Sequence, residues 1–169
     1  MLQDHLLIDY LAKVKERLKA NGFNISENVN SDDHVFKLVA RRRRFQIEHL
    51  GLAETFFIFT EHHSPDIHLL EESFKQCFKY ARKSKISPLP YTPILDIAVC
   101  FPVAMVDNID YTILKHVRNT NPPWHFADYE LDAVCDLNRS QLYYSEKTPH
   151  WAMMLWDYFR KQAREMLSP

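Results

Sequence analysis

The six residues from Thr55 to Thr60 limit the fold of this chain more than any other stretch, because all of them are β-branched or aromatic. Such side chains fit a pleated, packed surface. Apolar residues occupy consecutive positions rather than alternate ones, so the run predicts a strand buried on both faces in the middle of a sheet. The polar residues Glu61 to His63 follow it, and Ser64-Pro65 then predicts the start of a helix that runs from about Pro65 to Lys83.

The segment before this run predicts a helix and two strands that lead into it. A helix from about Asp4 is stopped by Asn21-Gly22, and a short strand follows around Phe23 to Val29. The next strand lies within His34 to Leu50 and is expected to pair antiparallel with the central run near Phe45 to Glu48. Its apolar residues, with Phe36, Leu38 and Ala40 expected on one face, change parity on either side of Arg41 to Arg44. This change predicts a β-bulge within the arginines.

The segment after the helix predicts a second buried strand from Ile94 to Val106, parallel to the first, in which Pro102 indicates an early end or a bulge. A short helix near 109–117, a half-exposed strand from Tyr129 to Leu137 and a last helix from Thr148-Pro149 follow. The predicted order is therefore helix, three-strand meander, helix, strand, and then helix, strand and C-terminal helix. Residues 1–169 are expected to form a single domain of the α/β (α+β) class around a mixed sheet.

Composition excludes several classes of function. The chain has 169 residues, a formal net charge of −1 and two glycines, so it contains no glycine-rich phosphate loop and no Gly-x-Ser-x-Gly nucleophile elbow. Its three cysteines are widely spaced in apolar runs, which predicts buried thiols rather than a disulfide framework. No apolar run approaches the roughly 18 residues that span a bilayer. A soluble, cytoplasmic protein without membrane contact is expected.

The order helix, three-strand meander, helix and parallel strand resembles the core of the restriction-endonuclease-like fold over roughly residues 4 to 106. Gln76-Cys77-Phe78-Lys79-Tyr80 is similar to the Gln-x-x-x-Tyr signature of several nuclease branches of the PD-(D/E)xK superfamily. In those nucleases the helix follows a strand that bears a metal-binding Glu-x-Lys. The corresponding strand end here is Glu61-His62-His63, with histidine in the place of the lysine.

The resemblance implies catalytic positions at Glu61, His63, Gln76 and Tyr80, and metal positions at Glu61 and Asp33, with Asp32 as an alternative to Asp33. Phosphodiester hydrolysis of this type uses two carboxylates to hold Mg²⁺ and a lysine to orient the water. His63 is a nitrogen ligand that suits Zn²⁺ or Mn²⁺ better than Mg²⁺. The expected function is a catalytically degenerate or weak restriction-endonuclease-like domain that acts on or beside nucleic acid, with Mg²⁺ or Mn²⁺ as its cofactor if it is active.

Arg42 and Arg44 are candidate nucleic-acid contacts, because guanidinium groups fit phosphate oxygens. Alternate residues of a strand share a face, so at most two of the four arginines from Arg41 to Arg44 lie on one surface. The alternative is that these charges protect an edge strand from pairing with other chains.

Other polar groups have structural explanations beside functional ones. The metal-ligand types in Glu61, His62, His63, Asp66 and His68 match no recognised spacing, so a polar loop between strand and helix is the alternative to a metal site. His125, beside Trp124, is either a ligand contact or a packed part of its loop.

The alternative function is a non-enzymatic protein-binding module, an inhibitor or accessory subunit, on the same scaffold. The last helix carries Trp151, Met154 and Tyr158 as a second apolar line beside its core stripe. This line predicts either packing against the loop Pro122-Pro123-Trp124 or a homodimer through the C-terminal helix.

Overall fold

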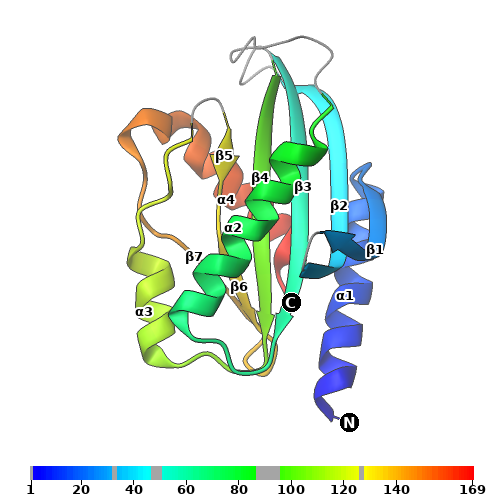
Figure 1. The fold of residues 1–169 in the computed structure, drawn as a ribbon, viewed down its shortest axis with the longest axis vertical. Coiled ribbons are helices and arrows are strands. Elements are labelled where there is room, and N and C mark those ends of the chain that lie inside the picture. Colours follow the sequence, from blue (N-terminus) through cyan, green and yellow to red (C-terminus); the bar gives the residue numbers. More distant parts are fainter. Residues whose placement is uncertain (1, 32–33, 47–50, 87–95, 126–127) are drawn as a thin grey trace.

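A mixed β-sheet forms the middle of the molecule, with helices on both faces (Figure 1). The structure is a computed structural model, which describes residues 2–31, 34–46, 51–86, 96–125 and 128–169. Its elements in chain order are α1 (Leu2–Ala20), β1 (Asn24–Ser31), β2 (His34–Gln46), β3 (Gly51–His62), α2 (Ile67–Ser84), β4 (Asp96–Val106), α3 (Tyr111–Asn119), β5 (Tyr129–Glu130), β6 (Ala133–Asp136), β7 (Gln141–Tyr144), the 3-10 turn η2 (His150–Ala152) and α4 (Met153–Leu167).

Within the described residues, seven strands form this sheet in the order β1-β2-β3-β4-β6-β7, and the short β5 also pairs with β4. The first three strands are an antiparallel meander, and β4 runs parallel to β3. Strands β5 and β6 continue the parallel part, and β7 returns antiparallel to β6. The predicted α+β class and mixed sheet are confirmed, whereas the strand expected from Tyr129 to Leu137 is divided into β5 and β6, and β7 was not predicted.

Strand β3 is central and buried on both faces, as its six-residue run predicted. Phe56 and Ile58 pack under α2, which crosses the front of the sheet in Figure 1, while Phe57 and Phe59 pack on the opposite face among residues of α1 and α4. All four side chains are completely buried. Each face of this strand therefore contributes to a different layer of the core.

The predicted register of β2 and the predicted bulge are wrong. Thr55 lies opposite Arg42 and Phe59 opposite Leu38, and the pairing continues without interruption through the arginines to Phe45 opposite Leu52. Phe45 needs no inward face, because β2 extends beyond the core and its ring is 61% exposed. The parity change occurs earlier, since Phe36 packs on the α2 face and Leu38 on the other.

Pro102 neither ends nor bulges β4, contrary to expectation. The carbonyls of Cys100 and Val106, which share its parity, accept hydrogen bonds from Leu131 and Leu137 at 3.0 and 2.9 Å. The backbone nitrogen of Pro102, which carries no hydrogen, therefore faces the side of β4 on which β5 and β6 lie. On that side β5 pairs only with Val99 and Cys100, and β6 begins at Val103, so the proline falls in the gap between the two short strands.

The C-terminal end of α1 agrees with the sequence, whereas α1 begins at Leu2, before the expected start near Asp4, and α2 begins later than expected. Gly22, with a φ of +77°, ends α1 as predicted, and the backbone N–H of Phe23 donates to the carbonyl of Leu18 at 3.0 Å. Helix α2 begins two residues later than expected. Its N-cap is Asp66, whose carboxylate accepts from the backbone N–H of Leu69 at 2.7 Å.

The C-terminal helix closes the layer behind the sheet. Trp156 is completely buried, and the Tyr10 hydroxyl of α1 donates to the carbonyl of Leu167 at 2.9 Å. Of the predicted second apolar line, Tyr158 is half-buried and packs against this core, while the side chains of Trp151 and Met154 lie outside the described part of the structure. Among the described helices, none is long and apolar enough to cross a membrane. The three cysteines are buried and are free thiols that form no disulfide.

Candidate functional site

Two of the predicted site residues, Glu61 and His63, lie together at the end of β3. The Glu61 carboxylate is 2.7 Å from the Lys37 ammonium and 3.9 Å from Nε2 of His63. Nδ1 of His63 lies 3.2 Å from Asp107, which follows β4. The His63 side chain is 75% exposed, so this is a shallow surface network at the carboxyl ends of two parallel strands. Sequence reasoning did not identify Lys37 or Asp107 as members.

The other predicted catalytic residues have different contacts. Gln76 donates to the Glu72 carboxylate at 2.7 Å, and the Tyr80 ring packs edge-on against Phe36 at 5.2 Å. The metal candidate Asp33, with its alternative Asp32, lies outside the described residues. In the part of the chain that the structure describes, no three His, Cys, Asp or Glu side chains are grouped so as to hold a metal ion.

The arginines of β2 divide between the two faces of the sheet and have partners on both. Arg42 lies 4.3 Å above the Phe23 ring and donates to the carbonyl of Asn21 at 2.7 Å. Arg44 donates to the Tyr158 hydroxyl at 3.4 Å. On the α2 face, Arg41 forms an ion pair with Glu54, a completely buried carboxylate that also accepts from the backbone N–H of Ile86. Glu54 was missed, although an acidic residue beside an apolar strand is a readable signal.

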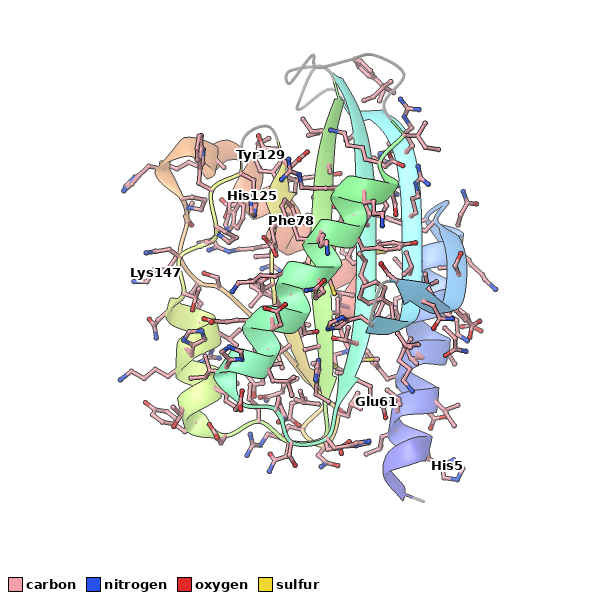
Figure 2. The ribbon with its side chains drawn as sticks, in the orientation of Figure 1. His5, Glu61, Phe78, His125, Tyr129 and Lys147 are labelled. Carbon is pink, nitrogen blue, oxygen red and sulfur yellow. The ribbon has the colours of Figure 1, made fainter. Side chains whose placement is uncertain are left out.

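A wide cleft lies between α2 and the segment from Thr120 to Asp132. It has a volume of about 550 Å³, and the residues that line it are Glu71, Phe74, Lys75, Phe78, Lys79, Arg82, Thr120, Asn121, Pro123, His125, Glu130 and Asp132. Figure 2 shows Phe78 and His125 close together there, far from Glu61 at the other end of the sheet. A recess of about 40 Å³, also lined by Glu130 and Asp132, continues inward to His116 and Leu131. Sequence reasoning did not predict this site.

Two carboxyl groups, those of Glu130 and Asp132, form the floor of the cleft. They are two residues apart in and just after β5, so both face α2. Glu130 is 5% exposed, and Oδ1 of Asp132 is buried without a hydrogen-bond partner among the described groups. Leu131, between them, faces the opposite layer. In the half-exposed strand predicted from Tyr129 to Leu137, Glu130 and Asp132 alternate with apolar residues and so belong to the exposed face. This prediction is wrong for Glu130, because α2 covers that face.

His125 connects the loop to this floor. Its ring stacks on Phe78 with centroids 3.8 Å apart, and its Nε2 is 2.6 Å from Oε2 of Glu130. The predicted packing role is therefore present, and the ring also contacts an ionisable group of the cleft. The remaining walls are apolar at Phe74 and Pro123.

Burial changes the protonation of these groups. It raises the pKa of Glu130 to about 8, against a smaller lowering by the hydrogen bond to Asp132. It also raises the pKa of Asp132 well above its usual value, helped by the charge of Glu130. The pKa of His125 is lowered, first by burial and then by the nearby Arg82. At neutral pH the two carboxyl groups therefore retain at least one proton between them, beside a neutral imidazole.

The cleft also has a basic rim. Lys75, Lys79 and Arg82 line the cleft from one side of α2. Arg82 is 3.3 Å from the Asp128 carboxylate, which accepts from the backbone N–H of Ala98 at 2.9 Å. The cleft thus combines an apolar wall, a positive rim and a proton-holding carboxyl pair. Such a combination of a concave site with perturbed ionisable groups is typical of functional sites.

Comparisons of the chain with protein-family models, with curated proteins and with solved structures gave no match.

Proposed function

We propose that the cleft between α2 and the segment from Thr120 to Asp132 is the active site of an acid–base enzyme that acts on a small organic anion. The observation that supports this most directly is the pair Glu130 and Asp132, two carboxyl groups that line the cleft and have raised pKa values. A carboxyl group that keeps its proton near neutral pH can donate it to a substrate and take a proton back at the same place.

The roles follow from the contacts. Glu130 is the proton donor, because its pKa of about 8 keeps it protonated at neutral pH. The Glu130 carboxylate left after this transfer is the proton acceptor, while the raised pKa of Asp132, which also lines the cleft, keeps that group protonated. His125 is a positioning residue that holds Glu130 through the contact of 2.6 Å. This arrangement suits proton transfer steps such as those of isomerisation or hydration.

The lining indicates the class of substrate. Phe74, Phe78 and Pro123 suit an apolar or aromatic body, and Lys75 with Lys79 on the rim suits a carboxylate or another anion. The volume of about 550 Å³ lies within the usual range for small-molecule sites.

The proposal can be tested with benzoate and phenylacetate as probes. We expect their addition to shift the backbone NMR signals of Phe74 and Phe78, and the double variant Lys75→Gln with Lys79→Gln to weaken binding by about tenfold. A matched double variant, Lys13→Gln with Lys19→Gln, removes the same charge from the exposed side of α1 and should bind as the wild type does.

A carbon-13 titration of the carboxyl groups provides the second measurement. Glu130 should titrate near pH 8. The acid–base proposal fails if Glu130 titrates near its ordinary value of 4.5, and the substrate class fails if neither probe shifts residues of the cleft.

A restriction-endonuclease-like domain, degenerate or weak, is a second candidate function. It is supported by the observed order of α1, the antiparallel meander of β1 to β3, α2 and the parallel strand β4. Its site would be the network of Glu61, His63, Lys37 and Asp107, with Mg²⁺ or Mn²⁺ as cofactor and Arg42 and Arg44 as contacts to nucleic acid. Cleavage of DNA or RNA that needs Mn²⁺ and is lost in Glu61→Ala would support it; no cleavage with either metal would remove it.

A protein-binding module, a homodimer through the C-terminal helix and a cytoplasmic location are further proposals for this chain. Met153, at the start of the C-terminal helix and 59% exposed, supports a contact surface there. Sedimentation at high micromolar concentration tests the dimer, and a purely monomeric protein would rule it out.

A further inference from the structure

A second hollow, separate from the cleft, lies at the edge of the sheet beside β7. It has a volume of about 380 Å³, and its lining is Arg118, Leu142, Tyr143, Tyr144, Glu146, Arg160 and Arg164. Helix α3, which supplies Arg118, packs on the face of α2, whereas α4, which supplies Arg160 and Arg164, packs on the other. The three guanidinium groups therefore reach this edge from both sides of the sheet. Figure 2 labels Lys147 near the hollow, on the same side of the molecule.

The lining has an excess of positive charge. Three arginines and the single carboxylate of Glu146 give a net charge of +2, that is, three minus one. Glu146 accepts from Nε of Arg118 at 3.2 Å, but its side chain is 66% exposed, and such pairs neutralise little in water. Asp157, which is 3.6 Å from Arg160, is 88% exposed and outside the lining.

The three arginines differ in what their donors do. Arg160 holds the loop that follows β7, because it donates to Thr148 at 2.9 Å and to the carbonyls of Lys147 and Ser145 at 2.8 and 3.2 Å. Arg164 uses one nitrogen to donate to the Tyr144 hydroxyl at 3.0 Å, and Arg118 uses Nε for Glu146.

The two arginines Arg118 and Arg164 therefore keep N–H groups that have no partner among the described residues. The Tyr144 hydroxyl accepts from Arg164, which leaves its own O–H able to donate. These groups present several hydrogen-bond donors to the hollow and few acceptors.

We propose that this hollow binds the phosphate group of a small phosphate monoester. Guanidinium groups match phosphate oxygens with two donors at once. A monoester carries close to two negative charges above its second pKa of about 6, which balances the lining. Leu142 and the ring of Tyr143 supply an apolar wall for the organic part. An extended nucleic acid needs a long positive stripe, whereas here the acidic Asp157 and Glu165 of α4 adjoin the arginines.

Isothermal titration calorimetry with phenyl phosphate at low ionic strength tests the proposal. We expect saturable binding to the wild type and at least about tenfold weaker binding to Arg118→Gln with Arg164→Gln, because charge-assisted hydrogen bonds are lost. The matched control is Lys13→Gln with Lys19→Gln, which should bind as the wild type does. Binding should be stronger at pH 8 than at pH 5, because the second proton leaves phosphate near about pH 6.

Tyr144→Phe gives an independent readout, since it removes one hydroxyl and no charge, and it should weaken binding about threefold or more. Absence of saturable binding at about 10 mM phenyl phosphate would overturn the proposal, as would equal affinity of the Arg118 and Arg164 double variant. If oligothymidylate binds more tightly than phenyl phosphate and the double variant loses this binding, the proposal of a monoester is overturned in favour of a nucleic-acid backbone. The difference in affinity between the wild type and the Arg118 and Arg164 double variant should persist in saturating benzoate, the probe of the cleft, which separates this test from that of the cleft.

Discussion

Replacement of Glu130 by glutamine should stabilise the protein at alkaline pH. In the folded protein the pKa of Glu130 is raised from 4.5 to about 8 by burial. The unfolded chain releases the proton near 4.5, so between that pH and about 8 the folded state binds more protons than the unfolded state does. The free energy of unfolding must then decrease as the pH rises through this range and level off above it. Glutamine cannot ionise, so the variant does not lose free energy of unfolding in this way as the pH rises.

The size of the effect follows from the pKa difference. At 1.36 kcal/mol for each pKa unit, a change from 4.5 to about 8 corresponds to an upper limit of about 5 kcal/mol at pH 8 and above. The Glu130 side chain is only 6% exposed, so solvent screening reduces this little. The coupled Asp132 shares the protons of the pair, and we therefore expect a difference of about 2–4 kcal/mol.

Urea unfolding at pH 5, 6.5, 8 and 9 measures the effect as a slope against pH. The wild type should lose stability over this range relative to Glu130→Gln, whatever constant offset the changed hydrogen bond to His125 introduces. Glu165→Gln is the matched control, because Glu165 is exposed and its closest described cation, Lys161, is 3.8 Å away. This control should parallel the wild type.

Parallel curves for the wild type and Glu130→Gln between pH 5 and 9 would refute the reasoning. They would mean that Glu130 ionises at an ordinary pH in the folded protein. Glu130 would then be ionised at neutral pH and could not be the proton donor, and the proposed acid–base chemistry would lose its basis.

Two further predictions concern the core of the sheet. Arg41→Gln should destabilise the protein by about 2–4 kcal/mol in urea unfolding, because it leaves the buried Glu54 carboxylate without its cation. The control, Arg43→Gln at an exposed position, should change stability by less than about 0.5 kcal/mol, and similar values for the two variants would contradict the prediction. Phe57→Ala should cost about 3–5 kcal/mol, because the ring is completely buried and stacks on Phe101 at 4.4 Å, while Phe45→Ala on the exposed end of β2 should cost less than about 1 kcal/mol. A small effect at Phe57 would argue against a central β3.

Much of the fold was predictable because its signals are local. Consecutive apolar residues in Thr55–Thr60 require cover on both faces, and only a central strand provides it. Gly22 ends α1 because its positive φ suits a residue without a side chain. The register of β2 was not predictable from parity, since exposed rings such as Phe45 also contribute to the apolar pattern. The sequence wrongly predicted a strand end or bulge at Pro102, because the gap between β5 and β6 that accommodates this proline is formed by strands that come later in the chain.

The candidate site was predictable only in part. Glu61 and His63 are two residues apart on one strand end, and alternation alone brings them to the same side. Gln76 and Tyr80 share a helix side, but their contacts depend on which strands α2 crosses. The network around Glu61 also includes Lys37 and Asp107, which come from two other elements.

The sequence by itself determined the composition of the layers: the central strand, the helices that cover it and the turns at their ends, because these depend on side chains within a few residues of one another. Only the tertiary structure decided the chemistry of the cleft. Glu130 and Asp132 follow a polar alternation typical of an exposed strand, and their pKa values rise because α2, some fifty residues earlier in the chain, lies over them and excludes water. The energy of a buried charge depends on everything that surrounds it, and the order of residues along β5 does not specify those surroundings.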